Sequence, residues 1–321
     1  MFAGQGKPIH VTEVTTRDGF QIEPTFVPTA AKIGLIDELS RTGLPKIEVT
    51  SFTSPKAIPS LRDAEEVFRG IVRAPGVIYS CLVPNQRGAE RALAVKVDEI
   101  NLVMSVSETH NLANLRMTRE QSYAQLAETI RAVRHSGIVT NASLSACFGC
   151  PMEGPVAEAD VWRFSERLLA AGAGGISLCD TTGMAHPAQV AGMVEEFRRR
   201  FPTAALALHL HNTRGMGLAN ILAALQAGAD CFDASLGGLG GCPYAPGATG
   251  NVCTEDLVHM LEAMGFTTGV DLGLLLECAR RLPEIVGHDV PGQVAKAGRI
   301  QDQHLEPEWL AEVREKALER E

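Results

Sequence analysis

Two histidines separated by one residue, His209 and His211, are the first feature of this chain that indicates chemistry. They end a segment with the apolar character of a β-strand, and residues i and i+2 of a strand face the same side. Imidazole is a common ligand of divalent metals, so the pair predicts a metal site. Two core or surface histidines that meet by chance are the structural alternative.

An acidic residue after the first predicted strand could complete such a site. Asp18 follows Arg17 and precedes a glycine, where a local ion pair is the simplest interpretation. If the strands close into a barrel, the first and seventh strands are near neighbours, and Asp18 would meet His209 and His211. One carboxylate and two imidazoles suit a divalent cation with positions open for substrate, and Arg17 would add a fixed positive charge beside it.

A glycine-rich segment from Gly237 to Asn251 carries a single thiol, Cys242. Six of its fifteen residues are glycine, so a loop after the eighth strand could close over a site and deliver Cys242 to a substrate. The segment has neither the Gly-Lys-Ser/Thr of a phosphate-binding loop nor the spacing of a dinucleotide fingerprint. A surface loop with an incidental cysteine is the alternative.

These residues need a scaffold in which short strands and helices alternate. The pattern predicts strands at His10–Val14, Lys46–Ser51, Val77–Leu82, Glu99–Val106, Ile138–Ala146, Gly175–Asp180, Ala205–His211 and Cys231–Ser235. It predicts helices at Thr29–Arg41, Arg119–His135, Glu158–Ala171, Pro187–Arg200, Leu218–Ala227 and Glu255–Met264. Eight such units over about 265 residues favour a closed (β/α)8 TIM barrel over a doubly wound open sheet.

Several predicted strands carry polar residues at their C-terminal ends, which is where the chemistry of a TIM barrel takes place. Glu48 and Ser51 end one strand, Ser177 and Asp180 another, and Asp233 lies near the end of the last. We expect residues 1–270 to form the catalytic barrel. Residues 271–321 should form additional C-terminal helices packed on the barrel, because apolar residues at helical spacing and then a highly charged stretch follow.

Composition limits the classes of function. The 321 residues are 45% hydrophobic and carry a net charge of −9, which is typical of a globular protein and unsuited to general nucleic-acid binding. No apolar run has the roughly 20 residues of a membrane-spanning helix, and the first residues do not resemble a signal peptide. Eight scattered cysteines indicate reduced thiols, so we expect a cytoplasmic protein.

The motifs around these residues resemble the 3-hydroxy-3-methylglutaryl-CoA lyase family of the DRE-TIM metallolyases, from about Ile9 to Val294. The matching segments are 16–21 (Thr-Arg-Asp-Gly-Phe-Gln), 48–56, 177–183, 209–213, 238–245, 247–251 and 254–256. The segment around Cys242 marks the lyase branch, whereas Arg-Asp-Gly and His-x-His are shared across the superfamily.

The resemblance implies a metal-dependent enzyme of leucine catabolism that cleaves 3-hydroxy-3-methylglutaryl-CoA to acetyl-CoA and acetoacetate. It implies Mg²⁺ or Mn²⁺ as cofactor, an acyl-CoA as substrate and a homo-oligomer, either dimer or tetramer. The implied metal ligands are Asp18, His209, His211 and Asn251. The implied catalytic residues are Arg17 for the enolate, Cys242 for proton transfer, and His209, with Asp18 as its rival, as the base. The implied substrate-binding residues are Gln21, Glu48, Ser51, Asn114, Ser177, Asp180 and Glu255.

Some residues depart from the family pattern and keep alternatives open. Phe20 stands where Leu is usual, Ile22 where Asn is usual, and Arg214 where Tyr is usual. Such changes could adapt the acyl pocket to a related thioester, such as a citramalyl-CoA or an isoprenoid-extended hydroxyglutaryl-CoA. A condensing enzyme of the isopropylmalate-synthase type, an aldolase for 4-hydroxy-2-oxo acids and a barrel that only binds ligands are the further alternatives.

Overall fold

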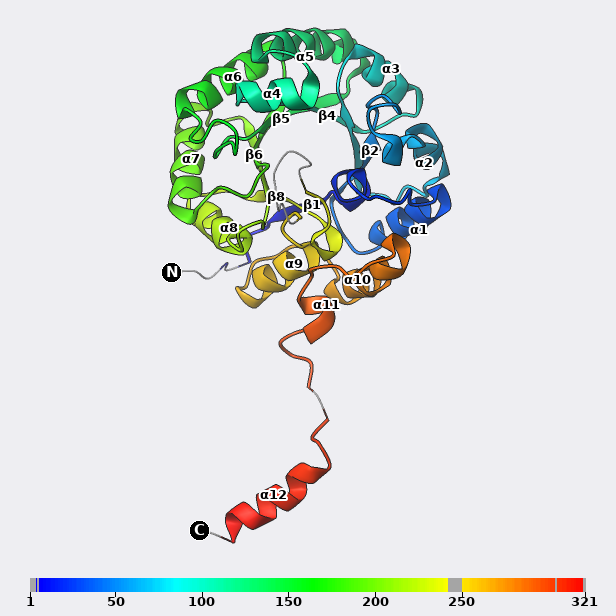
Figure 1. The fold of residues 1–321 in the computed structure, drawn as a ribbon, viewed down its shortest axis with the longest axis vertical. Helices are drawn as coiled ribbons and strands as arrows, with labels where there is room; N and C mark the ends of the chain where they lie inside the picture. The colour runs from blue at the N-terminus through cyan, green and yellow to red at the C-terminus, as the bar shows by residue number, and fades with distance from the viewer. Residues whose placement is uncertain (1–3, 5, 242–249, 304, 320–321) are drawn as a thin grey trace.

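Eight parallel strands form a closed barrel in the computed structural model, which describes residues 4, 6–241, 250–303 and 305–319. Neighbours in sequence are neighbours in the barrel, and β1 closes against β8 (Figure 1). The strands are β1 (His10–Glu13), β2 (Lys46–Ser51), β3 (Ile78–Val83), β4 (Glu99–Ser105), β5 (Val139–Ser145), β6 (Gly175–Asp180), β7 (Ala205–Leu210) and β8 (Cys231–Ala234). The predicted TIM barrel is therefore confirmed, with each strand end within one residue of its prediction.

Helices surround the barrel as an outer ring (Figure 1). They are α1 (Thr29–Leu39), α2 (Ala64–Gly70), α3 (Gln86–Ala94), α4 (Glu108–Leu115), α5 (Arg119–Val133), α6 (Glu158–Ala171), α7 (Pro187–Arg200), α8 (Gly217–Gln226) and α9 (Thr254–Ala263). Short helical turns are η1 (Thr15–Gly19), η2 (Pro59–Leu61), η3 (Arg134–Ser136) and η4 (Leu236–Gly238). The sequence pattern did not predict α2, α3 and α4, which are short.

Local signals explain where these helices begin and end. Thr118 and Gln121 form a reciprocal capping box at the start of α5, which satisfies two backbone N–H groups that lack partners within the helix. Gly172 ends α6 in the left-handed region with a φ of 112°, as the glycine at this position predicts. Such caps fix the point at which each helix turns back toward the next strand.

The apolar core lies between the strands and the helices, whereas much of the barrel interior is polar. Outward-facing residues such as Ile47, Ile100 and Leu208 are fully buried against the helices. Inward-facing residues include Glu48 and Glu99, which are also buried. Burial of apolar side chains stabilises the outer layer by about 25 cal/mol per Å², so the interior is free to carry polar groups for other purposes.

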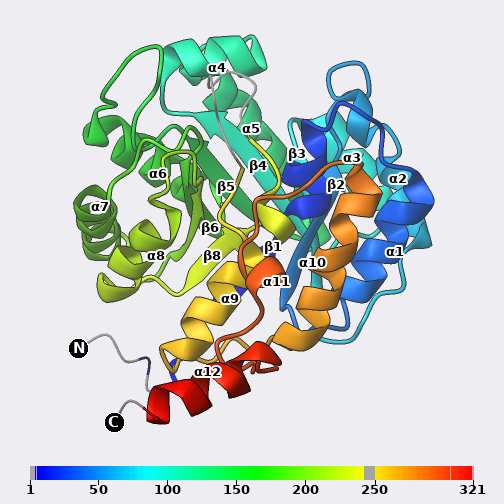
Figure 2. The same cartoon turned by 60° about the horizontal axis from the view of Figure 1, so that its bottom comes forward.

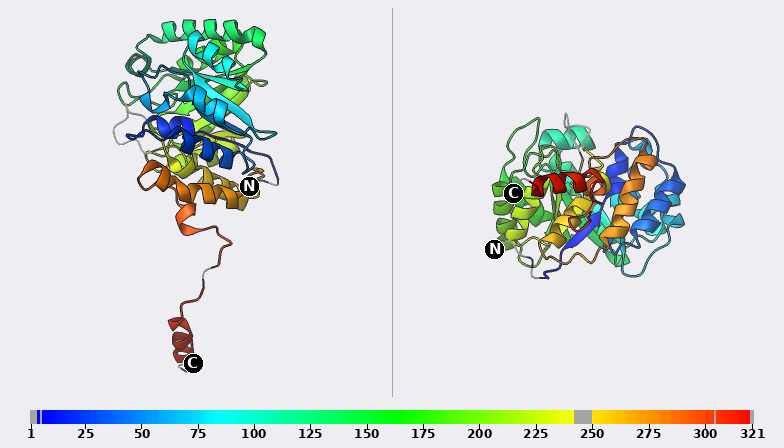
Figure 3. Two further views of the ribbon diagram at one scale, coloured as in Figure 1. Left: turned by 90° about the vertical axis from the view of Figure 1, so that its right-hand side faces the viewer. Right: turned by 90° about the horizontal axis from the view of Figure 1, so that it is seen from below.

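The C-terminal segment continues the fold in two different ways. α10 (Leu272–Val286) packs beside α1 and α9, and α11 (Val294–Ala297) follows next to α10 (Figure 2). We expected the whole segment 271–321 to pack on the barrel. α12 (Trp309–Leu318) instead lies away from the barrel wall in Figures 1 and 3, and none of its residues is buried.

None of the described helices combines the length and the apolar character that are needed to cross a bilayer.

Candidate active site

Three potential ligand atoms converge at the C-terminal end of the barrel. Nε2 of His209 lies 3.1 Å from Nε2 of His211, and each of these nitrogens lies 3.9 Å from Oδ2 of Asp18. The three residues form the group in the described chain that could hold a metal ion, and they are buried or nearly so. The predicted meeting of Asp18 with the two histidines is therefore present.

The barrel topology explains this meeting. Asp18 lies in η1, the turn that directly follows β1, and β8 is the single strand between β1 and β7. His209 belongs to β7, and His211 directly follows the strand and forms a bridge with Asn251. The two-residue spacing keeps both imidazoles on the inner face, toward the turn that carries Asp18.

The surroundings shift the pKa values of the two imidazoles in opposite directions. Burial and the neighbouring His209 lower the pKa of His211 to about 3, so this ring is neutral. Burial opposes a charge on His209 too, but its hydrogen bond with Asp233 and the charge of Asp18 raise its pKa. Burial also disfavours an ionised Asp18, yet Arg17 and the two histidines hold the pKa of this carboxyl well below its usual range.

These residues fit a divalent cation. Metal ligation requires neutral imidazole and ionised carboxylate, which are the states favoured for His211 and Asp18. Nδ2 of Asn251 donates to Oδ2 of Asp18 at 2.7 Å and to the carbonyl of Leu239 at 3.0 Å, which fixes the amide orientation. Oδ1 of Asn251 is buried and has no hydrogen-bond partner among the described residues, so it is free to act as a further oxygen ligand.

Arg17 is held between two carboxylates beside this group. Its Nε donates to Glu48 and its Nη1 donates to Asp18. Burial would lower the pKa of Arg17, but Glu48 and Asp18 raise it above its ordinary value, so the guanidinium stays charged. A fixed positive charge therefore lies next to the three converging ligand atoms.

A cavity of about 580 Å³ opens above these groups. Arg17, Asp18, His209 and His211 form part of its wall. Other parts of the wall combine apolar residues from the loop after β2 with polar residues from β4, β5 and α4. This is the size and mixed character of a small-molecule site.

Comparison with known proteins gives the family of the chain. Residues 8–282 match the model of the HMGL-like family. The chain is 48% identical over 287 residues to a hydroxymethylglutaryl-CoA lyase from Bacillus subtilis, which covers 89% of this chain and 96% of the relative. It is 42% identical to the mitochondrial hydroxymethylglutaryl-CoA lyase of mouse, over 91% of this chain and 90% of the relative. The chain belongs to the hydroxymethylglutaryl-CoA lyase family.

Solved structures agree with this assignment. An HMG-CoA lyase from Acinetobacter baumannii, in complex with coenzyme A and 3-methylmalate, has a TM-score of 0.90 and 52% sequence identity. The match covers 93% of this chain and 98% of that one. The HMG-CoA lyase of Bacillus subtilis has a TM-score of 0.88 and 47% identity, over 91% and 98% of the two chains.

The predicted site residues of the family pattern fall into two groups in the structure. One group lines the cavity: Arg17, Asp18, Gln21, Asn114, His209 and His211. The other group lies outside the cavity wall among the described residues: Glu48, Ser51, Ser177, Asp180, Asn251 and Glu255. Within this second group, Glu48 and Ser177 line a separate cavity at the opposite end of the barrel.

Two members of the second group support loops around the cavity. Oδ1 of Asp180 accepts a hydrogen bond from the backbone of Met184 at 2.8 Å, and burial raises the pKa of Asp180 to about 6. Oε2 of Glu255 accepts from the backbone of Gly237 at 3.0 Å, at the base of the glycine-rich segment, and burial raises the pKa of Glu255 to about 7. Both carboxyls thus hold backbone around the cavity, and their other oxygens, Oδ2 of Asp180 and Oε1 of Glu255, are buried without a hydrogen-bond partner among the described residues.

Gly240, in the described part of the glycine-rich segment, lies directly against two of the predicted metal ligands. Gly240 has a φ of 104°, and a Cβ added there would lie 2.5 Å from Nδ2 of Asn251 and 3.0 Å from Oδ2 of Asp18. Only glycine accommodates this close approach. Gly241 lines the cavity, and the next residue, the predicted catalytic Cys242, lies outside the described residues.

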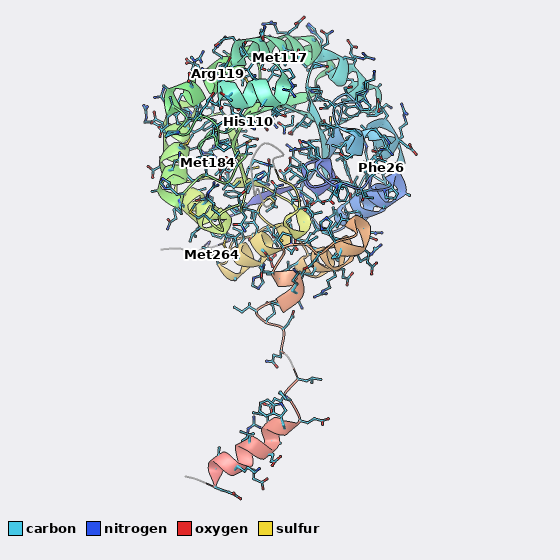
Figure 4. All side chains as sticks on the ribbon, viewed as in Figure 1. Phe26, His110, Met117, Arg119, Met184 and Met264 are labelled. Carbon is cyan, nitrogen blue, oxygen red and sulfur yellow. The ribbon has the colours of Figure 1, made fainter. Side chains whose placement is uncertain are left out.

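Residues that depart from the family pattern differ in their relation to the cavity. Ile22 lines it. His110, which Figure 4 labels on the inner side of α4, lies in the same wall, although it is not among the predicted site residues. Phe20 is buried in the core and Arg214 donates to the carbonyls of Thr182 and Gly183, so neither belongs to the cavity wall. Substitution at these two positions therefore gives little reason to expect a different acyl group.

Sequence reasoning missed one residue that contacts the ligand group directly. Oδ2 of Asp233 lies 3.2 Å from Nδ1 of His209, and the two residues are register partners on β8 and β7. Carboxylates commonly orient metal-ligating histidines in this way. The signal was present, since Asp233 is a polar residue near the end of a predicted strand, but the pattern did not indicate its partner.

Proposed function

We propose that this protein is a metal-dependent carbon–carbon lyase that cleaves 3-hydroxy-3-methylglutaryl-CoA to acetyl-CoA and acetoacetate. The observation that carries the proposal is the convergence of Asp18, His209 and His211 beside a charged arginine, in a chain that belongs to the hydroxymethylglutaryl-CoA lyase family. The coenzyme A bound to the Acinetobacter baumannii relative supports an acyl-CoA as the substrate class.

The proposed metal ligands are Asp18, His209, His211 and Asn251, with Mg²⁺ or Mn²⁺ as the ion. A bound divalent ion would lower the pKa of the substrate hydroxyl and hold hydroxyl and carboxylate oxygens together. Converging ligand atoms, a neutral His211 and the buried Oδ1 of Asn251 support this set.

His209 is the base that we propose for the proton of the tertiary hydroxyl. Its Nδ1 faces Asp233, so the proton would be accepted at Nε2. Metal binding and proton acceptance would then compete for Nε2, so Asp18 is the alternative base. Loss of the hydroxyl proton lets a carbonyl form at C3 as the C2–C3 bond breaks, and the bonding electrons pass to the thioester as an enolate.

Arg17 and Cys242 would complete the reaction. The guanidinium of Arg17 lines the cavity and is fixed by Glu48 and Asp18, so it would stabilise the negative charge on the enolate oxygen. Cys242 would donate its proton to the enolate carbon, which releases acetyl-CoA. The position of Gly241 in the cavity wall supports this role for the residue that follows it.

Residues outside this reaction centre have supporting roles in the proposal. Gln21 and Asn114 would contact the acyl-CoA, because both line the cavity. Ser51, Asp180 and Glu255 would act through the loops and side chains they hold, and Glu48 through Arg17. Ser177, which lines the cavity at the opposite end of the barrel, stays a predicted substrate contact. A homo-oligomeric state and a cytoplasmic location stay predictions.

The test of the proposed function is the release of acetyl-CoA from 3-hydroxy-3-methylglutaryl-CoA, followed by chromatography. We expect release with Mg²⁺ or Mn²⁺, loss of release with EDTA, and recovery when excess metal is added. A protein that binds metal and yet releases no acetyl-CoA would contradict this substrate, and a citramalyl-CoA or an isoprenoid-extended thioester would be tried next.

The role of Cys242 has its own test. Replacement Cys242→Ser should reduce turnover at least about 100-fold, the usual scale for a proton-transfer group, and leave metal binding intact. Cys278→Ser is the matched control, because Cys278 is buried in α10 away from the cavity wall. Equal turnover in the two variants would remove Cys242 from the mechanism.

A further inference from the structure

Two tiers of polar side chains cross the inside of the barrel. The upper tier consists of Glu48, Asn101 and Ser143, and the lower tier consists of Lys46, Glu99 and Asn141. Each lower residue precedes its upper counterpart by two positions on β2, β4 or β5. Side chains two residues apart on a strand share a face, so both tiers point into the barrel.

The upper tier is a directed chain of hydrogen bonds that ends at Arg17. Oγ of Ser143 donates to Oδ1 of Asn101 at 2.9 Å, and Nδ2 of Asn101 donates to Oε1 of Glu48 at 2.9 Å. The other carboxylate oxygen of Glu48 accepts from Nε of Arg17. An ionised carboxylate can only accept, so Asn101 must present its amide nitrogen to Glu48.

This chain restricts the orientation of the Glu48 carboxylate. Glu48 is 2% exposed, and both of its oxygens have a partner in the barrel. Without Asn101, one oxygen would lose its donor and the carboxylate could turn about its last torsion. Arg17 would then lose the fixed direction of its Nε contact, while the contact of Nη1 with Asp18 alone leaves the guanidinium free to swing.

The lower tier resembles the upper one in chemistry but does not reach Arg17. Nζ of Lys46 and Nδ2 of Asn141 both donate to Oε1 of Glu99, so the charges of this tier compensate each other. Its three residues line a separate cavity at the other end of the barrel. Asn101 lines both cavities and therefore lies in the floor of the upper one.

We propose that Asn101, supported by Ser143, is a positioning residue that orients Arg17 through Glu48. The part of this inference that concerns the enolate rests on the proposed lyase function. Asn101 aims the guanidinium at the point where negative charge develops, and a displacement of about 1 Å there can reduce the rate about 100-fold.

Steady-state kinetics with paired variants tests the inference. Asn101→Ala should reduce kcat about 10–100-fold with KM within about twofold, because the lost contact serves the transition state. Ser143→Ala should reduce kcat about threefold, and it keeps the inference testable if Asn101→Ala fails to fold. Asn141→Ala removes an equivalent amide from the lower tier and should change neither constant. Equal kinetics for Asn101→Ala and Asn141→Ala would overturn the inference.

A double-mutant cycle tests whether Asn101 acts through Glu48. The double variant Glu48→Gln with Asn101→Ala should be no slower than Glu48→Gln alone, since the path to Arg17 is already interrupted. Rate losses that multiply would mean that Asn101 acts independently of Glu48 and would overturn the proposed path.

A spectroscopic readout separates this inference from the proposed function. The Nε–Hε signal of Arg17 in a ¹H–¹⁵N spectrum can be assigned by its loss in Arg17→Lys. In Asn101→Ala this signal should shift and exchange faster with water, and in Asn141→Ala it should stay unchanged. An unchanged signal in Asn101→Ala would refute positioning. This measurement needs no turnover. If the protein cleaves no thioester, the lyase function is disproved, and the spectrum still tests whether Asn101 positions Arg17.

Discussion

The two ends of the barrel interior use similar residues in opposite ways. At the lower end, a cavity of about 460 Å³ has charges that meet opposite charges: Lys46 pairs with Glu99, and Arg198 pairs with Asp230 at 3.1 Å. At the upper end, three potential ligands converge within 4.8 Å of one another. The paired charges at the lower end compensate each other, whereas the upper end gathers three ligand atoms of the kinds that bind a divalent cation.

Packing differs from a usual barrel in the same region. TIM-barrel interiors are commonly filled by layers of bulky branched side chains. Here Gly175, Ala205 and Ala207 face the lower cavity, and a Cβ on Gly175 would lie 2.8 Å from Oδ1 of Asn141. These small residues therefore leave room for the polar side chains of the lower tier.

The largest expected effect comes from removing one of the converging ligands. His211→Ala should abolish Mn²⁺ binding measured by calorimetry and reduce turnover at least about 1000-fold, because the ion is worth several kcal/mol to the transition state. His135→Ala, which removes an exposed histidine, is the control. Undiminished Mn²⁺ affinity in His211→Ala would mean that the upper end does not bind the metal through this residue, and the proposed difference between the two ends would be wrong.

Removal of the positive charge beside the ligands should have the next largest effect. Arg17→Gln should reduce turnover about 100-fold with Mn²⁺ still bound, because an electrostatic contact to the enolate is lost while the ligands remain. Arg198→Gln, which removes the arginine paired with Asp230 at the lower end, should leave turnover unchanged. If Arg17→Gln releases the metal, the arginine serves to hold Asp18 rather than to stabilise charge.

The contrast also shows how far the sequence could predict this molecule. Local periodicity sufficed for the strands and for the His209–His211 pair, because both depend on residues close together in the chain. The contact of Glu48 with Asn101 spans 53 residues and crosses the barrel over β3, so it depends on the stagger of the strands. The contact of Asp233 with His209 could not be predicted either, because the sequence pattern of one strand does not determine its register with the next strand.

Short helices were missed for a related reason. Asn85 caps the start of α3, where its side chain accepts a hydrogen bond from the backbone of Gly88, and Ser107 caps the start of α4, where its side chain accepts from the backbone of His110. Both caps were readable signals. The helices themselves have nine and eight residues, too few for an apolar period to stand out, and packing against the barrel stabilises them.

A smaller effect should follow from the outer partner of His209. Asp233→Asn keeps the size of the side chain but removes its charge from Nδ1, so Mn²⁺ affinity should fall roughly 10–100-fold. Asp230→Asn provides the comparison, since Asp230 lies close by in sequence and pairs with Arg198 at the lower end. Equal affinities for the two variants would mean that Asp233 does not orient His209.

The smallest effect on turnover is expected at the lower end, where Lys46→Met leaves Glu99 without its cation. Loss of one partner of a fully buried pair costs roughly 3–5 kcal/mol, and the Lys46 side chain is 22% exposed, so we expect about 2 kcal/mol of lost stability. Urea unfolding measures this, and the double variant with Glu99→Gln should recover most of it. Turnover of the folded Lys46→Met protein should match the wild type, because the lower tier ends without reaching Arg17. A large loss of turnover at unchanged stability would show that the two ends work as one site.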